Sequence, residues 1–321
     1  MKELNQWFLR HRRELPWRKD PTPYAVWVSE IMLQQTQVNV VLPYFQKWMS
    51  LFPTIESLAA ATRERVIKAW EGLGYYSRAR NLHEGAKYVM QVHQGILPKT
   101  SEELSKVKGI GPYTVGAILS FAFKEAAPAV DGNVMRVITR LFKIETEIER
   151  VETKREIEKK VLSILGPEPW ISMEGLIELG ALVCKKKPLC EECPLSAKCL
   201  GKGLDLPKKK KPRPIISVTK QIALVRCDED CLVKKNHEGL MADLFEFPLL
   251  EDVSHLPLEK QKDNPPVEHS YTHYRATLFS TLFSVKNKQP VANLQWVPLR
   301  HLPLLPFSSG HRKLLKKWRS E

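Results

Sequence analysis

The sequence predicts an all-α N-terminal domain followed by a smaller α+β C-terminal domain. Three observations support this fold class. The 321 residues exceed one ordinary domain and suit two. Apolar residues recur at helical spacing through the first 200 residues, and Pro or Gly marks the short connections. β-branched, partly alternating segments begin only after a Lys- and Pro-rich stretch. We therefore expect a helical domain over 1–205, a basic linker over 206–216 and an α+β domain over 217–321.

Each expected element follows from its own local pattern. Amphipathic periodicity predicts helices over Val26–Leu42, Glu56–Trp70, Asn81–Val92, Thr114–Phe123, Val134–Leu141 and Lys154–Leu165. Alternation predicts a strand over Ile215–Arg226, which returns as Cys231–Lys235 across an acidic turn. His273–Lys286 is also rich in β-formers, and Ser309–Arg319 predicts a terminal helix.

Charge and composition limit the function classes. The 43% hydrophobic content excludes a disordered chain, and no apolar run has the length of a membrane span. The formal charge is +14, and nine of these excess charges fall in residues 201–214 and 311–321. Such clusters favour a polyanion, although a solvated linker and a solvated terminal helix would also explain them. The N-terminus lacks a secretory apolar region, so we expect an intracellular protein whose six cysteines are ligands or buried thiols.

Leu104–Ala117 (LSKVKGIGPYTVGA) has the pattern of a helix-hairpin-helix. Gly109 and Gly111 form the turn, and Pro112 begins the second helix. Small glycines let backbone N–H groups at a helix N-terminus approach a phosphate without reading the base sequence. An ordinary helix–helix connection is the alternative, and we favour the DNA contact.

Two carboxylates are candidates for chemistry. Asp131 precedes an amphipathic helix, where its ordinary role is an N-cap, but it follows the hairpin by one helix, and Asn133 can hydrogen-bond it. Glu30 lies in an apolar helix, either on its wet face or buried with the raised pKa that a general acid needs. Polar residues after Glu30 can bond base edges, and Tyr75 and Tyr76 can stack on or wedge between bases.

Four cysteines lie within sixteen residues, spaced Cys184-x5-Cys190-x2-Cys193-x5-Cys199. Zinc ribbons use two Cys-x2-Cys pairs, and only one such pair occurs here. The compact loop favours a 4Fe–4S cluster, and structural zinc is the alternative. Cys227 and Cys231 lie outside this group and are expected to be thiols of the C-terminal domain.

Together these motifs resemble the endonuclease III superfamily of DNA glycosylases, and within it the MutY-type adenine DNA glycosylases. The resemblance runs along nearly the whole chain. Its strongest stretches are LPWR at 15–18, VWVSEIMLQQTQV at 26–38, GLGYYSRARNL at 72–82, GIGPYTVGAILS at 109–120, VDGNVMRV at 130–137 and ELGALVC at 178–184.

The resemblance implies the removal of adenine mispaired with 8-oxoguanine or guanine, after the adenine is flipped from the duplex. Glu30 matches the glutamate that protonates adenine N7, and Asp131 matches the aspartate that stabilises the oxocarbenium sugar or attacks it. Asn133 and Tyr113 match supporting residues. Bifunctional members place a Schiff-base lysine where Tyr113 stands, so we expect a monofunctional glycosylase.

We expect further contacts with DNA or its bases from residues in the matching stretches. These are Arg18, Trp27, Leu33, Gln34, Gln35, Thr36, Leu73, Tyr75, Gly109, Gly111, Phe307 and Ser308.

The C-terminal domain resembles the Nudix-like 8-oxoguanine-recognition domain of the same family, through GLMADLFEFP at 239–248 and HSYTHY at 269–274. The glutamate-rich box of active Nudix hydrolases is absent from the sequence. The family's Phe-Ser-His loop is longer here, Phe307-Ser308-Ser309-Gly310-His311, and the first cysteine loop has five residues where six are usual. Phe307 can wedge this loop into the groove or pack the final helix onto the sheet.

Three alternatives are weaker. A thymine or uracil mismatch glycosylase would share the helical domain but not the C-terminal one. A non-catalytic DNA-binding relative would not need both carboxylates, and a membrane-surface protein would need an amphipathic basic helix beside the linker. We therefore expect a cytoplasmic, nucleoid-associated monomer that carries a 4Fe–4S cluster and binds duplex DNA containing A:8-oxoguanine or A:G, with no membrane partner.

Overall fold

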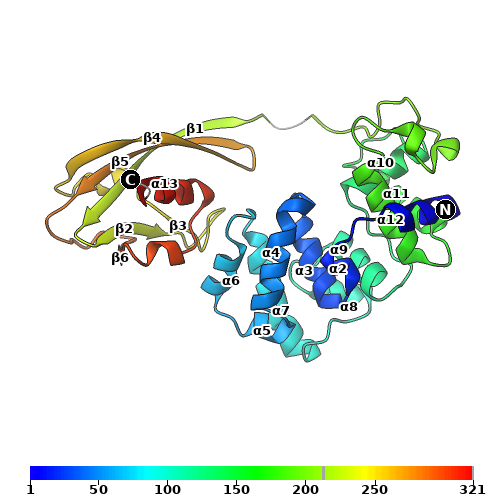
Figure 1. Ribbon diagram of the computed structural model, residues 1–321, viewed down its shortest axis with the longest axis horizontal. Helices are drawn as coiled ribbons and strands as arrows, with labels where there is room; N and C mark the ends of the chain where they lie inside the picture. The colour runs from blue at the N-terminus through cyan, green and yellow to red at the C-terminus, as the bar shows by residue number, and fades with distance from the viewer. Residues whose placement is uncertain (212–213, 320–321) are drawn as a thin grey trace. The chain divides into compact units, whose positions relative to one another are not determined.

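The computed structural model describes residues 1–211 and 214–319, which form two compact units (Figure 1). The helical unit comprises 1–60 and 81–211, and the sheet unit comprises 61–80 and the described residues after 211. Pro212 and Arg213 of the predicted linker, and Ser320 and Glu321 of the predicted C-terminal domain, lie outside the described residues. Within the described part of the chain, no helix has the length and apolar character of a membrane span.

The helical unit confirms the predicted all-α character of the N-terminal region. Its principal helices are α1 (Lys2–His11), α2 (Pro16–Lys19), α3 (Pro23–Leu33), α4 (Val38–Leu51), α5 (Ile55–Ala59), α8 (Ser101–Lys106), α9 (Pro112–Ala117), α10 (Gly132–Leu141), α11 (Val151–Ile164) and α12 (Pro169–Leu182). A π-helical turn, Ile118–Ala122, continues α9. The long helix α7 (Ser77–His93) begins in residues of the sheet unit and continues through residues of the helical unit.

Two predicted helices are each broken in the structure. Val26–Leu42 is divided between α3 and α4, because Gln35 adopts φ 57°, a left-handed conformation that no α-helix continues through. Glu56–Trp70 is divided between α5 and α6 (Arg63–Trp70), where the Thr62 side chain accepts a hydrogen bond from Arg65 N and caps the new helix. The periodicity identified the apolar faces correctly but did not reveal these breaks.

The centre of the helical unit is helix α3. Its residues from Tyr24 through Met32 are all buried, so the helix has no solvent-facing side over these turns. Thr22 caps it by accepting from Ala25 N, and Pro23 occupies the first turn, where its missing N–H has no cost. Helix α12 is apolar nearly all round and packs against α1 and α10. Glu30 therefore sits inside the unit and not on a wet face.

The sheet unit contains a mixed six-stranded sheet. Its strands are β1 (Ile216–Cys227), β2 (Asp230–Lys235), β3 (Phe245–Glu246), β4 (Glu259–Tyr271), β5 (Tyr274–Ser284) and β6 (Leu294–Pro298). The order is β3-β2-β1-β5-β4, and β6 pairs with β2. β1 and β5 run parallel in register from Ile216 opposite Tyr274, and the other strand pairs are antiparallel. The predicted β1–β2 hairpin and the β5 strand are confirmed.

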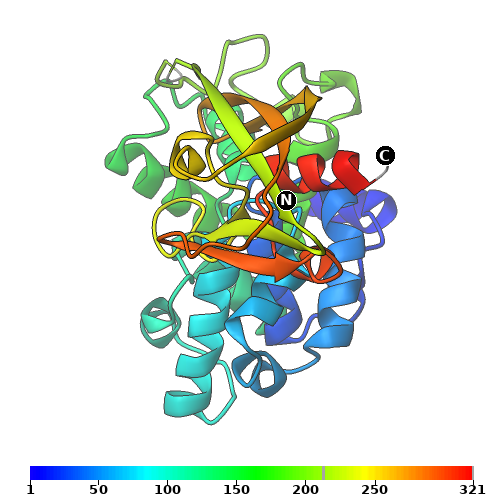
Figure 2. The same ribbon diagram turned by 90° about the vertical axis from the view of Figure 1, so that its left-hand side faces the viewer.

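Each face of the sheet has its own core. On one face, Leu314 and Leu315 of α13 (Ser309–Arg319) pack with buried strand residues such as Leu224 and Leu278. The ribbon of α13, red in Figure 2, lies beside the sheet. Phe307, directly before this helix, belongs to the same cluster. The opposite face is covered by the segment after β3, where Val253 and Leu256 join residues of β1 and β2. The predicted terminal helix is confirmed, and its burial on the sheet explains its amphipathic pattern.

Candidate active site

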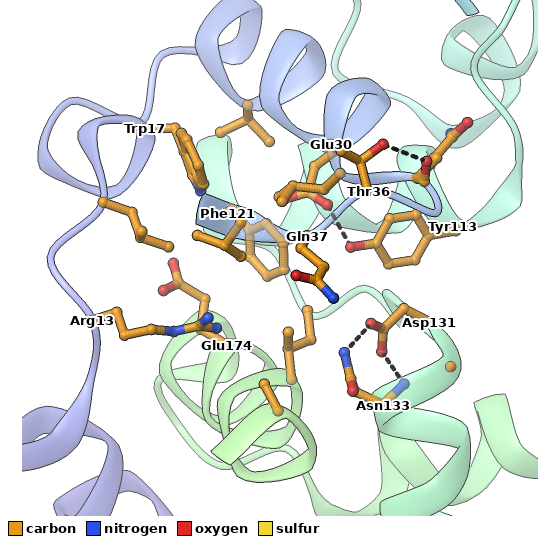
Figure 3. Close-up of a pocket in the computed structure, with 18 of the residues that line it drawn as sticks. Arg13, Trp17, Glu30, Thr36, Gln37, Tyr113, Phe121, Asp131, Asn133 and Glu174 are labelled. Carbon is orange, nitrogen blue, oxygen red and sulfur yellow. Dashed lines mark hydrogen bonds between the residues drawn. The ribbon is translucent and has the colours of Figure 1, made fainter. Parts of the chain in front are cut away.

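A cavity of about 840 Å³ lies in the helical unit, a volume suited to a small ligand (Figure 3). Its wall is built from α2, α3, the turn that follows α3, α9, the beginning of α10, and α12. Predicted site residues that line it are Arg18, Glu30, Leu33, Gln34, Gln35, Thr36, Tyr113, Asp131 and Asn133. Chain folding therefore brings together segments as far apart in sequence as α2 and α12.

Glu30 is the carboxyl group that α3 presents to this cavity. Only 6% of its surface is exposed. Burial raises its pKa to about 7, and the nearby Asp131 and Glu174 carboxyls add to the shift, while the Tyr113 hydrogen bond and Arg18 oppose it. A carboxyl group with this pKa holds a proton near neutral pH and can donate it to a bound ligand. The wet-face alternative for Glu30 is thus wrong.

The hairpin turn before α9 places Tyr113 beside Glu30. Gly109 adopts φ 88°, and a Cβ at this position would lie 2.8 Å from the Cβ of Asn81, so only glycine fits. Gly111 is the N-cap of α9, which begins at Pro112 as expected. One residue later, the Tyr113 hydroxyl donates a hydrogen bond to Glu30 Oε2 (Figure 3). Burial, together with the neighbouring carboxyls, raises the pKa of Tyr113 well above its ordinary value, so the phenol remains a neutral donor.

Asp131 lines the same cavity from the N-terminus of α10. Its Oδ1 accepts from Asn133 N at 2.9 Å and Val134 N at 2.8 Å, which makes it the N-cap of the helix. Its Oδ2 accepts from the Asn133 side-chain amide at 2.7 Å, so the expected Asn133 contact is confirmed. Burial raises the pKa of Asp131, and these three donors oppose that rise. The N-cap role and the cavity-lining role therefore belong to one carboxyl group.

An ion-pair network from α12 closes another side of the cavity. Arg18 Nε lies 2.9 Å from Glu174 Oε2, and Arg18 Nη2 lies 2.9 Å from Glu178 Oε2. Arg13 Nε adds a second contact with Glu178, at 2.8 Å. Burial raises the pKa of Glu178, but the two arginines outweigh it and lower that pKa to about 2. Arg18 is thus held in place beside the cavity, where its charge also acts on Glu30.

Glu174 and Glu178 were missed by the sequence reasoning. They are four residues apart on a helix that is otherwise almost wholly apolar. This is the same signal that singled out Glu30, because an acid within an apolar helix is either paired or functional. Burial raises the pKa of Glu174, and Arg18 and Lys124 oppose this effect.

Similarity to known proteins agrees with this geometry. The sequence model for an HhH-GPD superfamily base excision DNA repair protein matches residues 28–164, and a NUDIX domain model matches residues 221–317. An adenine DNA glycosylase of Buchnera aphidicola subsp. Baizongia pistaciae is 37% identical over 254 residues, which cover 76% of this chain and 72% of that protein. The chain belongs to the adenine DNA glycosylase family.

Other relatives extend the comparison. The Arabidopsis thaliana adenine DNA glycosylase is 38% identical over 292 residues, which cover 76% of this chain but only 46% of that longer protein. A solved thermostable thymine-DNA glycosylase matches with a TM-score of 0.57 and 26% identity, over 62% of this chain and 93% of that one. The resemblance deduced from the motifs and the predicted fold class are both confirmed by these matches.

Several residues expected to contact DNA in this family member lie elsewhere. Trp27 is fully buried in α3, and its ring packs against Gly85 of α7. It is not among the residues that line the cavity described above. Leu73 and Tyr75 belong to the sheet unit, where Leu73 is buried and Tyr75 is 40% exposed with φ 46°. Phe307 and Ser308 are fully buried in the same unit, and their contact with DNA stays a prediction.

Phe307 packs the end of the chain onto the sheet. Its ring lies 5.2 Å from the Phe247 ring, and the Arg312 guanidinium lies 5.1 Å from the Phe307 ring. His311 is also buried, and its Nδ1 accepts from Phe247 N at 2.9 Å. Burial lowers the pKa of His311 to about 4, so this imidazole is neutral and structural.

The four clustered cysteines surround one cavity of about 190 Å³ in the helical unit. All four are unpaired thiols with partial exposure. Among the described residues, no three ligand-type side chains converge as they would around one metal ion. Four cysteine thiols around one cavity are a ligand set for a 4Fe–4S cluster, and they are also a ligand set for a structural zinc. The four thiols therefore fit the group that the family resemblance implies.

Arg140, near the C-terminal end of α10, holds this cysteine segment. It is only 8% exposed. Its Nη1 lies 3.3 Å from Cys184 Sγ and donates to Lys185 O at 2.6 Å, and its Nε donates to Leu206 O at 2.9 Å. A buried guanidinium beside the cysteines offsets the negative charge that thiolates carry. Asp131 and the cysteine segment are thus attached to opposite ends of one helix.

Proposed function

We propose that this protein is a monofunctional DNA glycosylase that removes adenine mispaired with 8-oxoguanine or guanine. The observation that carries the proposal is the pair formed by the buried Glu30 and the half-buried Asp131, which line one cavity while the pKa of Glu30 is raised to about 7. Family membership supports the choice of adenine, since the relatives from Arabidopsis thaliana and Buchnera aphidicola are adenine DNA glycosylases.

The proposed chemistry follows from the two carboxyl groups. Glu30 in its protonated form donates a proton to N7 of the extruded adenine, which makes the base a better leaving group. The bond between the sugar C1′ and adenine N9 then breaks, and the carboxylate of Asp131 stabilises the positive charge that develops on the sugar. Water adds to C1′, and the ionised Glu30 accepts a proton from that water. Tyr113 is a half-buried, neutral phenol, so it orients Glu30 and forms no imine with the sugar.

DNA binding is assigned to the hairpin turn. The glycine-rich turn leaves the first N–H groups of α9 without intrahelical partners, and these groups bind a backbone phosphate in our proposal. Such a contact holds the duplex without reading its sequence. The polar turn Gln34–Thr36, which lines the cavity, is assigned contacts with base edges.

Cys184, Cys190, Cys193 and Cys199 are the residues that would hold a 4Fe–4S cluster. By holding the cluster, these four cysteines would cross-link a segment whose regular structure is limited to the short 3₁₀ turns Cys190–Glu192 and Ser196–Lys198. Lys186 and Lys202 also line this cavity and add positive charge around the thiolates.

Residues 217–321 are proposed to read the base opposite the adenine. The NUDIX domain match supports this assignment, and the thymine-DNA glycosylase match covers almost all of that protein but only 62% of this chain. We assign the reading of 8-oxoguanine to the turn that contains Ser308. The Ser308 hydroxyl is fully buried in the protein without DNA, so its pairing with the N7–H that oxidation creates requires this side chain to become exposed on DNA binding.

The test is base release under single-turnover conditions from duplexes that carry A:8-oxoguanine, A:G, T:G or U:G. We expect adenine release from the first two duplexes and no release of thymine or uracil. Release of thymine or uracil at a comparable rate would favour the mismatch-glycosylase alternative. Binding without any release would favour a non-catalytic relative.

A further inference from the structure

The turn that precedes α13 is held by two charged residues from a segment more than two hundred positions earlier. Lys68, in the last turn of α6, donates from Nζ to Pro303 O at 2.6 Å and to Leu305 O at 3.0 Å. Glu71, which directly follows α6, accepts a hydrogen bond from the Phe307 backbone N–H at 2.9 Å. All of these residues belong to the sheet unit. The backbone of the 303–308 turn thus depends on side chains that the sheet itself does not supply.

These contacts form one connected cluster that is largely shielded from solvent. Lys68 Nζ lies 2.6 Å from Glu71 Oε2, and Arg312 Nε donates to Glu71 Oε1 at 2.7 Å. The Glu71 and Arg312 side chains are only 16% and 17% exposed. Ion pairs in the open contribute little, but charged hydrogen bonds to a shielded carboxylate are strong and directional. The Arg312 guanidinium also lies over the Phe307 ring, so it contacts both Glu71 and the turn.

Glu71 directly precedes the Gly72–Tyr76 loop. This loop has its own rigid framework, because Trp70 Nε1 donates to Gly74 O at 3.1 Å and the Gly72 N–H donates to the Tyr76 hydroxyl at 3.2 Å. Arg78 Nη2 donates to Leu73 O and Gly74 O as well. The framework leaves Tyr75 exposed at the tip, in a left-handed conformation.

We propose that Glu71 and Lys68 are positioning residues that fix the Phe307–Ser308 turn to the Tyr75 loop, and thereby set the preference for 8-oxoguanine over guanine. This inference rests on the proposed function, in which the Ser308 turn reads the oxidised base. Neither residue touches DNA in this scheme. Each acts through the backbone of the turn, which it holds at a constant spacing from Tyr75.

Another ion pair of the same helix provides a matched control. Glu64, in the first turn of α6, lies 2.6 Å from Lys235 Nζ of β2. It also joins α6 to the sheet, but its side chain is 57% exposed and it does not contact the 303–308 turn in any bond described. If α6 served only to attach to the sheet, replacing Glu64 and replacing Glu71 would have the same effect on the preference for 8-oxoguanine.

The experiment compares Glu71→Ala, Glu71→Gln, Lys68→Met and Glu64→Gln in the full chain. Single-turnover rates of adenine release are measured on A:8-oxoguanine and A:G duplexes, and thermal unfolding is recorded for each variant. In Glu71→Ala we expect the ratio of the two rates to fall about tenfold, through loss of the hydrogen bonds to a shielded charge. In Glu71→Gln the rate ratio should fall less, since the amide oxygen still accepts from the Phe307 N–H. In Glu64→Gln the rate ratio should stay within about twofold of that of the parent protein.

An unchanged ratio in folded Glu71→Ala and Lys68→Met would overturn the inference, as would an equal loss in Glu64→Gln. If Glu71→Ala does not fold, Glu71→Gln and Lys68→Met decide the question. Ser308→Ala separates the positioning role of Glu71 and Lys68 from the proposed reading of the oxidised base. A lower ratio in Ser308→Ala with an unchanged ratio in the Glu71 variants rejects only the positioning role. An unchanged ratio in Ser308→Ala rejects the proposed reading of the oxidised base itself.

Discussion

The Tyr113 hydroxyl donates a hydrogen bond to Oε2 of Glu30 inside the helical unit. This bond favours the ionised carboxylate, whereas burial favours the protonated acid, and burial is the larger effect. The result is a carboxyl group whose pKa of about 7 lies at the pH where proton donation is most useful.

Replacement of Glu30 by Gln should abolish adenine release while mismatch binding persists. The amide keeps the size and polarity of the side chain but has no proton of comparable acidity, so we expect a loss of about 10²–10⁴-fold in the single-turnover rate. Gel-shift titration with an A:8-oxoguanine duplex measures the retained affinity. A single-turnover rate near that of the parent protein would contradict the assignment of Glu30.

The raised pKa of Glu30 also predicts how rate and stability depend on pH. Adenine release should decline as pH rises above about 7, because the proton to be donated is lost. The folded state binds this proton more tightly than the unfolded chain does, since the pKa rises from 4.5 to about 7 on folding. The stabilisation is therefore complete below about pH 4.5 and is lost as pH rises through 7, a change of about 3 kcal/mol.

Urea unfolding at pH 5 and pH 8 measures this effect. Glu30→Gln has no titrating group at this position, so its free energy of unfolding should fall less between the two pH values than that of the parent protein. Equal decreases in both proteins would show that Glu30 does not titrate in this range.

Tyr113→Phe should shift the pH profile and not simply lower the rate. Without the phenol, the burial of Glu30 is opposed by one donor fewer, so the pKa of Glu30 should rise further. The decline of the single-turnover rate at high pH should then begin at a higher pH than in the parent protein. A profile that keeps its midpoint, whatever the absolute rate, would show that this hydrogen bond does not tune Glu30.

Gly180→Ala should destabilise the beginning of α10. A Cβ on Gly180 would lie 2.6 Å from the Cβ of Asn133 and 2.9 Å from its carbonyl oxygen, so α12 must move away from the residue that bonds Asp131. We expect a loss of about 1–3 kcal/mol in the free energy of unfolding, with slower adenine release. Gly166→Ala is the matched control, because its Cβ would meet only Ser172 Oγ, at 3.9 Å. Similar losses in both variants would reject the steric explanation.

The purified protein should be brown and should contain about four irons per chain, as the proposed cluster requires. Cys190→Ser should lower iron content, solubility and DNA affinity more than it lowers the rate of the chemical step on bound substrate. Colorimetric assays measure iron and sulfide per chain, and elemental analysis measures zinc. One zinc per chain without iron would establish the structural-zinc alternative.

The sequence predicted the site well where a residue type conflicted with its surroundings. Glu30 in an apolar helix and Asp131 directly before a helix are such conflicts, and both line the cavity. What the sequence left open was the face on which Glu30 lies. That depends on α3 being covered on all sides by other helices, which local periodicity does not encode.

The strand β4 shows why part of the sheet was missed. Among its residues Glu259–Tyr271 only Val267 and His269 are buried, and Pro265 and Pro266 interrupt its pairing with β5. Charged side chains and proline are features of an edge strand, which pairs on one side only and needs no apolar alternation. The long antiparallel pairing with β5 holds β4 in the sheet. This pairing is a tertiary contact, so the local sequence of β4 does not predict it.

The attachment of Arg140 to the cysteine segment constrains how this lineage can change. A descendant that lost its four cysteines would keep a buried guanidinium without the Cys184 sulfur that it contacts, while the Arg140 bonds to the carbonyls of Lys185 and Leu206 would remain. Gly201 adds to the constraint, since its backbone lies so close to Arg140 that a Cβ would meet the Arg140 carbonyl oxygen at 2.5 Å. The segment is therefore expected to be inherited or discarded as a block, together with the residue at position 140.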